Sequence, residues 1–156
     1  MHVISQYFLL LENEEGTWDR RKISTMIIWH DLDEIIIGDI VSCKKHTEHA
    51  IDERTVQQEA LKLVPEILGQ SLQVIFDEYD KKETYETRFV KAIDKIEGYI
   101  QMYQSGFSPI LHSFGRSKKH SHVVIGKHVE EFKYIKRFYE VLDAMLESEG
   151  YFVAED

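Results

Sequence analysis

Five ionisable side chains fall within ten residues of one strongly apolar stretch, and their types suit the binding of a metal ion. They are His30, Asp31, Asp33, Glu34 and Asp39. Charge is costly to bury unless it is paired or holds a metal. The adjacent His30 and Asp31, at the end of an apolar helix, would offer an imidazole nitrogen and a carboxylate oxygen to one ion. The alternative is a histidine favoured by the helix dipole beside an ordinary loop aspartate.

Two further residues are candidate ligands from other predicted helices. Asp94 borders an apolar stripe within residues 90–97, and His2 lies on the first predicted helix. For Asp94, the alternative is a surface acid paired with Lys91 or Lys95. For His2, the alternative is an ordinary chain end.

Helical periodicity and capping residues predict the elements that would position these side chains. Thr17 or Asp19 is the expected cap of the second helix. Only two prolines and eight glycines interrupt the chain, which favours an all-helical class. The predicted helices span about 2–12, 19–30, 32–37, 53–63, 65–79, 84–103 and 128–149, with loops over 41–51, 79–82 and 105–126.

Apolar spacing supports three of these helices most directly. On the first helix the spaced residues are Val3, Tyr7, Leu10 and Leu11. On helix 84–103 the apolar stripe consists of Phe89, Val90, Ile93, Ile96 and Ile100. On the last helix the residues expected to face inward are Phe132, Ile135, Phe138, Leu142 and Met145.

Composition and charge restrict the partners and the compartment. The net charge of −9 repels a phosphate backbone, so polymeric nucleic acid is not expected as a partner. A small phosphorylated substrate is compatible, because a bound dication reverses the local sign. The single cysteine, Cys43, cannot form an intramolecular disulfide and indicates a reducing compartment. With no apolar run near about 18 residues and no basic leader, we expect no membrane span and a cytoplasmic location.

Taken together, these motifs resemble the HD-domain metal-dependent phosphohydrolases, and most closely their 5'-deoxynucleotidase branch. The family places a His on one helix, a His-Asp doublet at the end of the next, and an Asp on a later helix. In that branch the doublet is followed by a Glu and then by Gly-Asp-Ile, which here are Glu34 and Gly38-Asp39-Ile40. The late Asp context, Val-Lys-Ala-hydrophobic-Asp-Lys-hydrophobic-Glu, is reproduced by residues 90–97. The resemblance covers about residues 2–104.

The resemblance implies a role for each motif residue. The metal ligands would be His2, His30, Asp31 and Asp94. The mixed nitrogen and oxygen set suits one divalent ion, Mn, Co, Fe, Zn or Mg. Glu34 would position or deprotonate the attacking water, and Asp39 would bind or protonate the leaving oxygen of the substrate. Asp33 departs from the family pattern, as does the presence of Met1 alone before His2.

The sequence therefore predicts a single HD domain over residues 1–156, a helical bundle with a metal site between helices. Its motif-bearing core covers residues 2–104, and a C-terminal loop and helix cover residues 105–156. The expected reaction is hydrolysis of nucleoside or deoxynucleoside 5'-monophosphates. The alternatives are a phosphatase or pyrophosphohydrolase for another small metabolite, and a catalytically weak metal-binding regulatory module. Monomer and homodimer both stay open.

A second group of basic residues lies toward the C-terminus. A solvated loop is the ordinary interpretation of such a stretch, and a second metal or anion site is the other. The group comprises His112, Arg116, Lys118, Lys119, His120, His122 and His128.

Overall fold

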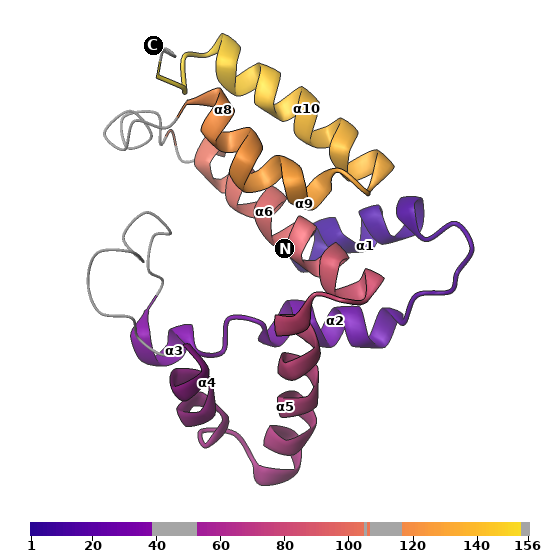
Figure 1. Cartoon of the computed structure of the whole chain (residues 1–156), viewed down its shortest axis with the longest axis vertical. Coiled ribbons are helices and arrows are strands. Elements are labelled where there is room, and N and C mark those ends of the chain that lie inside the picture. Colours follow the sequence, from indigo (N-terminus) through magenta and orange to yellow (C-terminus); the bar gives the residue numbers. More distant parts are fainter. Residues whose placement is uncertain (39–52, 105, 107–116, 154–156) are drawn as a thin grey trace. The chain divides into compact units, whose positions relative to one another are not determined.

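The computed structural model describes residues 1–38, 53–104, 106 and 117–153, and within these ranges the chain is helical with no strand (Figure 1). This confirms the predicted all-helical class. The helices are α1 (His2–Glu12), α2 (Arg20–Trp29), α3 (Glu34–Ile37), α4 (Glu53–Leu61), α5 (Glu66–Lys81), α6 (Tyr85–Gln104), α8 (Lys118–Ser121), η1 (His122–Gly126), α9 (Lys127–Val129) and α10 (Lys133–Ser148). The predicted loop 41–51 lies outside the described residues.

The chain divides into two compact units. The first contains Met1–Trp18 and Arg88–Asp156, and the second contains Asp19–Thr87. The first unit is thus built from the two ends of the chain, whereas the second is one continuous segment.

In the second unit, α2 begins where Asp19 caps it, as predicted. The Asp19 carboxylate accepts a hydrogen bond of 3.0 Å from the backbone N–H of Lys22, which satisfies one of the free amides of the first turn. Helices α2, α4 and α5 then bury their apolar faces together. The core cluster consists of Leu32, Ala60, Leu72 and Phe76, with Trp29, Leu61, Val64 and Leu68 packed against it.

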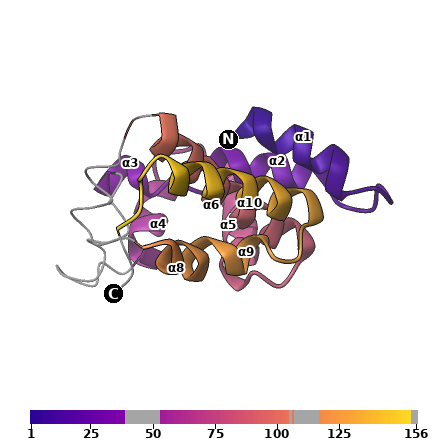
Figure 2. The same cartoon turned by 90° about the horizontal axis from the view of Figure 1, so that it is seen from above.

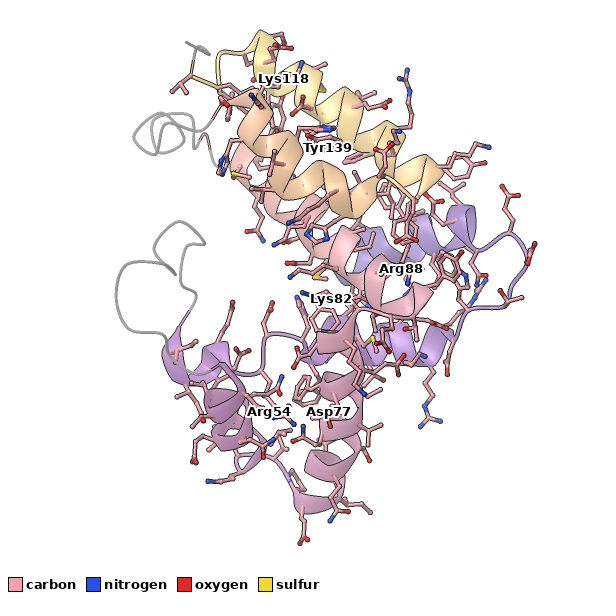
Figure 3. All side chains as sticks on the ribbon, viewed as in Figure 1. Arg54, Asp77, Lys82, Arg88, Lys118 and Tyr139 are labelled. Atoms are coloured by element: carbon pink, nitrogen blue, oxygen red, sulfur yellow. The ribbon has the colours of Figure 1, made fainter. Side chains whose placement is uncertain are left out.

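Ion pairs join the helices of the second unit at the surface. Lys22 Nζ lies 2.8 Å from Glu78 Oε1 and links α2 to α5. Arg54 Nη2 lies 3.5 Å from Asp77 Oδ1 and links α4 to α5, and Figure 3 shows the two side chains side by side. Helix α5 continues to Lys81, which lies within the predicted connector 79–82, and is followed by Lys82 with a left-handed φ of 56°.

In the first unit, the core lies along one face of α6. Phe89, Val90, Ile93 and Ile96 are fully buried, which confirms most of the predicted stripe. Helix α10 runs beside the α8–α9 segment in both views (Figures 1 and 2). Trp18 packs against two core rings from different elements. Its ring centroid is 5.4 Å from that of Phe89 and 6.1 Å from that of Phe132.

The predicted loop over 105–126 is wrong over its last nine residues. Ser117 accepts a hydrogen bond of 3.2 Å from the backbone N–H of His120 and begins a helical segment that continues to Val129. The break in helical structure falls instead at residues 130–132, within the predicted last helix. Ser121, Ile125 and Val129 supply a buried face at a spacing of four residues, which the polar and glycine-rich composition around them concealed.

Two apolar faces also differ from expectation. On α1, the residues whose spacing predicted the helix are exposed, Val3 at 70% and Tyr7 at 67%, whereas Phe8 and Leu9 are buried. On the last helix, Phe132, Ile135 and Leu142 are buried as predicted, whereas Phe138 and Met145 are 37% and 40% exposed. Tyr139 and Leu146 take the remaining core positions. Helix α1 is apolar on most sides, so it offers no single stripe from which to read its buried face.

The Glu12 carboxylate caps α10 from the end of α1. Its Oε1 accepts hydrogen bonds from the backbone N–H groups of Tyr134 at 2.6 Å and Ile135 at 2.8 Å. No side chain of α10's own flanking residue Phe132 makes this cap. A single carboxylate therefore satisfies two free amides and meets the positive end of the helix dipole.

We expect Glu12→Ala to lower the free energy of unfolding by about 1–2 kcal/mol, because two charge-assisted hydrogen bonds are lost. Glu12→Gln keeps an acceptor oxygen and should lose less. Urea denaturation measures both. Glu14→Ala is the matched control, since that exposed acid only approaches the Tyr134 hydroxyl at 3.4 Å. Equal stability of Glu12→Ala and the control would show that the cap contributes nothing.

Candidate metal site

His30 and Asp31 lie in contact at the end of α2. The Nε2 atom of His30 is 2.9 Å from Oδ2 of Asp31. The imidazole is almost fully buried, with 7% of its side chain exposed, whereas the carboxylate is 53% exposed. The doublet thus presents one buried nitrogen and one accessible oxygen at a common point.

The His30 ring is oriented by its own helix. Its Nδ1 lies 3.2 Å from the carbonyl oxygen of Ile27, and the ring of Tyr79 packs edge-on at 6.0 Å. A carbonyl oxygen only accepts, so Nδ1 carries the hydrogen and donates it. Nε2 then faces a carboxylate oxygen at 2.9 Å, an arrangement that a cation bound to both atoms would suit. A histidine held through Nδ1 by a backbone carbonyl, with Nε2 directed at a carboxylate, fits a metal ligand.

Glu34 stands one helical turn beyond this doublet. Its backbone N–H donates to the carbonyl of Asp31 at 3.1 Å, so the two side chains are at positions i and i+3 and on neighbouring turns. Glu34 is half-buried at the start of α3, which ends at Gly38. Gly38 has φ 74° and ψ 167°, a conformation that is essentially restricted to glycine. Asp39 lies outside the described residues.

Asp94 forms ion pairs on the surface of α6. Its Oδ2 is 2.8 Å from Lys91 Nζ and 3.3 Å from Lys95 Nζ, and the side chain is 25% exposed. These two ion pairs, with Lys91 and with Lys95, are the ones expected from the sequence as the alternative to a ligand role for Asp94. The ligand role of Asp94 stays a prediction.

His2 is the exposed first residue of α1. The amino group of the preceding Met1 lies 3.7 Å from Oε1 of Glu97, one turn after Asp94 on α6. The start of α1 therefore lies against the part of α6 that carries the late motif. Glu97 belongs to that motif, although its type and spacing alone indicate no role for it.

The predicted residues are divided between the two units. His30, Asp31 and Glu34 belong to the second unit, and His2 and Asp94 belong to the first. Within each unit, the described residues include no group of three or more His, Cys, Asp or Glu side chains that could hold a metal ion. The structure thus brings together one pair of the predicted ligands, His30 and Asp31.

The class of this helical protein with a His-Asp doublet is identified by comparison with known families. Residues 1–142 match the HD domain family. The chain belongs to this family.

Curated relatives and one solved structure are similar to this chain. The human 5'-deoxynucleotidase HDDC2 is 31% identical over 118 residues, which are 74% of this chain and 56% of the human protein. The 5'-deoxynucleotidase hdd1 of Schizosaccharomyces pombe is 25% identical over 109 residues, which are 66% of this chain and 55% of that protein. The chain thus spans about half the length of the curated relatives it matches.

The fold is shared with a crystal structure of a predicted metal-dependent phosphohydrolase from Magnetospirillum magnetotacticum. The TM-score is 0.73 at 17% sequence identity, and the match covers 96% of this chain and 78% of the other. At this identity the likeness concerns the fold.

The role of Asp94 can be separated from its ion pairs by two substitutions. If Asp94 binds the metal, Asp94→Asn should weaken Mn²⁺ affinity by at least about tenfold, because a ligand charge is lost. Lys91→Met, which removes the ion pair but keeps the carboxylate, should leave that affinity unchanged or raise it. Isothermal titration with Mn²⁺ measures both. A loss of at most about 1 kcal/mol of stability without any change in affinity would identify Asp94 as a surface ion-pair residue only.

Proposed function

We propose that this protein is a metal-dependent phosphomonoester hydrolase that acts on nucleoside or deoxynucleoside 5'-monophosphates. The observation that carries the proposal is the His30–Asp31 contact, with the ring anchored on the Ile27 carbonyl. Membership of the HD domain family and the names of the human and yeast relatives support it.

The proposed metal ligands are His30 and Asp31 together with His2 and Asp94. When bound, a divalent ion polarises phosphoryl oxygens and lowers the pKa of a coordinated water. The nitrogen and oxygen donors accept Mn, Co, Fe, Zn or Mg. Lys91 and Lys95 would release the Asp94 carboxylate to the ion and stay close enough to balance the charge of a phosphate group.

Two acids are proposed to handle the water and the leaving group. Glu34 is half-buried one turn from Asp31, where it would hold the attacking water and accept its proton. Asp39, which follows Gly38, would bind the leaving oxygen of the nucleoside and return a proton to it. The restricted backbone of Gly38 fixes the direction in which the chain leaves α3 toward Asp39.

The proposed partners and location follow from charge and composition. The substrate is a small phosphorylated molecule, and the net charge of −9 disfavours polymeric nucleic acid. Among the described residues, no helix combines the length and apolarity that crossing a bilayer demands. The single cysteine supports the cytoplasm as the location.

A homodimer is the proposed assembly. Val3, Tyr7 and Leu10 form an exposed apolar stripe on α1, and Val141 and Met145 form another on the neighbouring α10. Exposed apolar faces of this kind mark association surfaces. Sedimentation equilibrium should show a dimer that Tyr7→Glu dissociates, whereas a monomer at all concentrations would contradict this assembly.

The activity is tested by phosphate release from a panel of nucleoside and deoxynucleoside 5'-monophosphates with Mn²⁺, Co²⁺ or Mg²⁺. We expect metal-dependent release that a chelator abolishes. Asp31→Ala should lower kcat/KM by at least about 100-fold, because a ligand of the ion is removed. Asp33→Ala is the matched control: it removes the acid two residues along, which has no proposed role, and should retain activity.

Three outcomes separate the alternatives. Release of pyrophosphate from nucleoside triphosphates would favour the pyrophosphohydrolase. Tight metal binding with no turnover of any phosphoester would favour the regulatory module. Absence of metal binding by the folded protein would contradict every version of the proposal.

A further inference from the structure

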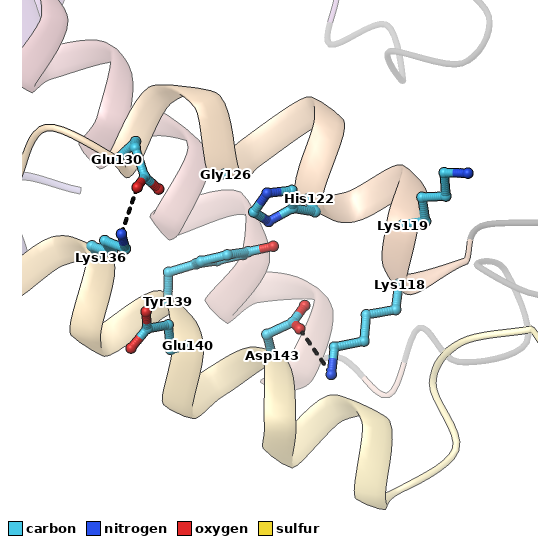
Figure 4. A pocket seen from close by; sticks show the side chains of 9 residues that line it. All are labelled: Lys118, Lys119, His122, Gly126, Glu130, Lys136, Tyr139, Glu140 and Asp143. Carbon is cyan, nitrogen blue, oxygen red and sulfur yellow. Dashed lines mark hydrogen bonds and ion pairs between the residues drawn. The ribbon is translucent and has the colours of Figure 1, made fainter.

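A separate cavity lies in the first unit between the α8–η1–α9 segment and α10. Its volume is about 480 Å³, within the range of small-molecule sites. Figure 4 shows its wall, with the ring of His122 beside the hydroxyl end of Tyr139 and with Asp143 and Lys118 toward one end. None of these residues belongs to the proposed metal site.

The shape of the cavity depends on a π-helical turn and a glycine. Residues His122–Gly126 form the turn, and such turns occur frequently at functional sites. The His122 ring lies directly over Gly126, where a Cβ atom would be 2.8 Å from Nδ1 of the ring. Any larger residue at position 126 would displace the imidazole, so the glycine permits the ring to form the wall.

Two polar side chains that line the cavity, Tyr139 and Asp143, are buried without full hydrogen bonding. Tyr139 is only 5% exposed, and its hydroxyl makes no hydrogen bond of good geometry among the described residues. Asp143, 6% exposed, accepts a hydrogen bond of 2.7 Å on Oδ1 from the Tyr99 hydroxyl. Its Oδ2 is 3.8 Å from Lys118 Nζ, beyond hydrogen-bonding distance.

These groups have complementary hydrogen-bonding roles. Burial, together with the neighbouring Asp143 carboxylate, raises the pKa of Tyr139, so its hydroxyl stays a donor at neutral pH. Oδ2 of Asp143 can only accept. A donor and an acceptor side by side match a hydroxyl group, which accepts from one and donates to the other. Leaving a buried hydroxyl unpaired costs free energy, which a bound hydroxyl group would recover.

The charges of the wall cancel. Lys118, Lys119 and Lys136 are balanced by Glu130, Glu140 and Asp143. Lys136 is already paired with Glu130, and Lys118 with Glu147 at 2.6 Å. The cavity therefore has no net charge with which to attract an ionic ligand.

We propose that this cavity is a binding site for a small neutral molecule bearing a sugar hydroxyl, either a free pentose or a nucleoside. The hydroxyl would lie between Tyr139 and Asp143. The rings of Tyr139 and His122 would contact the apolar face of the sugar or, in a nucleoside, the base.

The test is titration of the full-length protein, in a chelator-containing buffer that keeps metal from the proposed catalytic site. The probes are D-ribose, uridine and thymidine at millimolar concentration, with inorganic phosphate as an anionic comparison. Amide chemical shifts measured by NMR should change in residues 118–130 and 136–143 with uridine or ribose, and not with phosphate. If ribose binds as well as uridine, the site recognises the sugar. If only the nucleosides bind, the site recognises the base as well. Both results support the proposed site.

Tyr139→Phe removes only the hydroxyl oxygen of the side chain. We expect it to weaken binding about tenfold while leaving the stability of the protein unchanged or raised. Tyr134→Phe, on the same helix outside the cavity, is the matched control and should bind as the native protein does. Gly126→Ala should abolish binding through displacement of His122.

Three results would overturn the proposal. One is binding of the neutral probes that is unaffected by Tyr139→Phe, and another is a response to phosphate alone. The third is no response of the folded native protein to any neutral probe.

Discussion

The carboxylate of Glu12 at the start of α10 joins residues more than a hundred positions apart, and the first unit depends on it. Helix α10 needs an external cap because Phe132 supplies none. Glu12 meets that need and holds α1 antiparallel to α10, with the rings of Phe8 and Phe138 in edge contact at 5.6 Å. The same placement sets the first turn of α1 against Glu97 on α6. The cap at one end of α1 and the Met1–Glu97 contact at the other thus place this helix against α10 and α6.

The His30–Asp31 pair is positioned in a different way. Its ring is anchored on the Ile27 carbonyl three residues earlier, and its carboxylate partner is the next residue. All of this geometry is local to one helix end. A local arrangement follows from a short motif, whereas the positions of His2 and Asp94 depend on contacts between distant segments.

This difference explains what could be predicted from the sequence. The Asp19 cap, the Gly38 stop and the α6 stripe are local signals, and each is confirmed. The buried face of α1 could not be chosen, because Val3 and Tyr7 are as apolar as Phe8 and Leu9, and only the packing against α10 selects the second pair. The helical segment at 118–129 could not be predicted, because its buried positions include a serine and a glycine and are separated by histidine, lysine and exposed valine. Within the candidate site, the doublet could be predicted because His30 and Asp31 are adjacent in the sequence. Asp94 could not be assigned in the same way, because its carboxylate suits a surface ion pair as well as it suits a metal ligand.

Helix α10 serves two purposes with two of its faces. Ile135, Leu142 and Leu146 fill the apolar core, whereas Tyr139 and Asp143 bring a hydroxyl and a carboxylate into a nearly water-free position. Burying a carboxylate with a single hydrogen bond and a lysine at 3.8 Å is unfavourable compared with an apolar side chain of the same size. Packing alone therefore does not account for this choice of residues. A cavity wall that must bind a hydroxyl group does account for it, because the unsatisfied donor and acceptor are then the groups that the ligand completes.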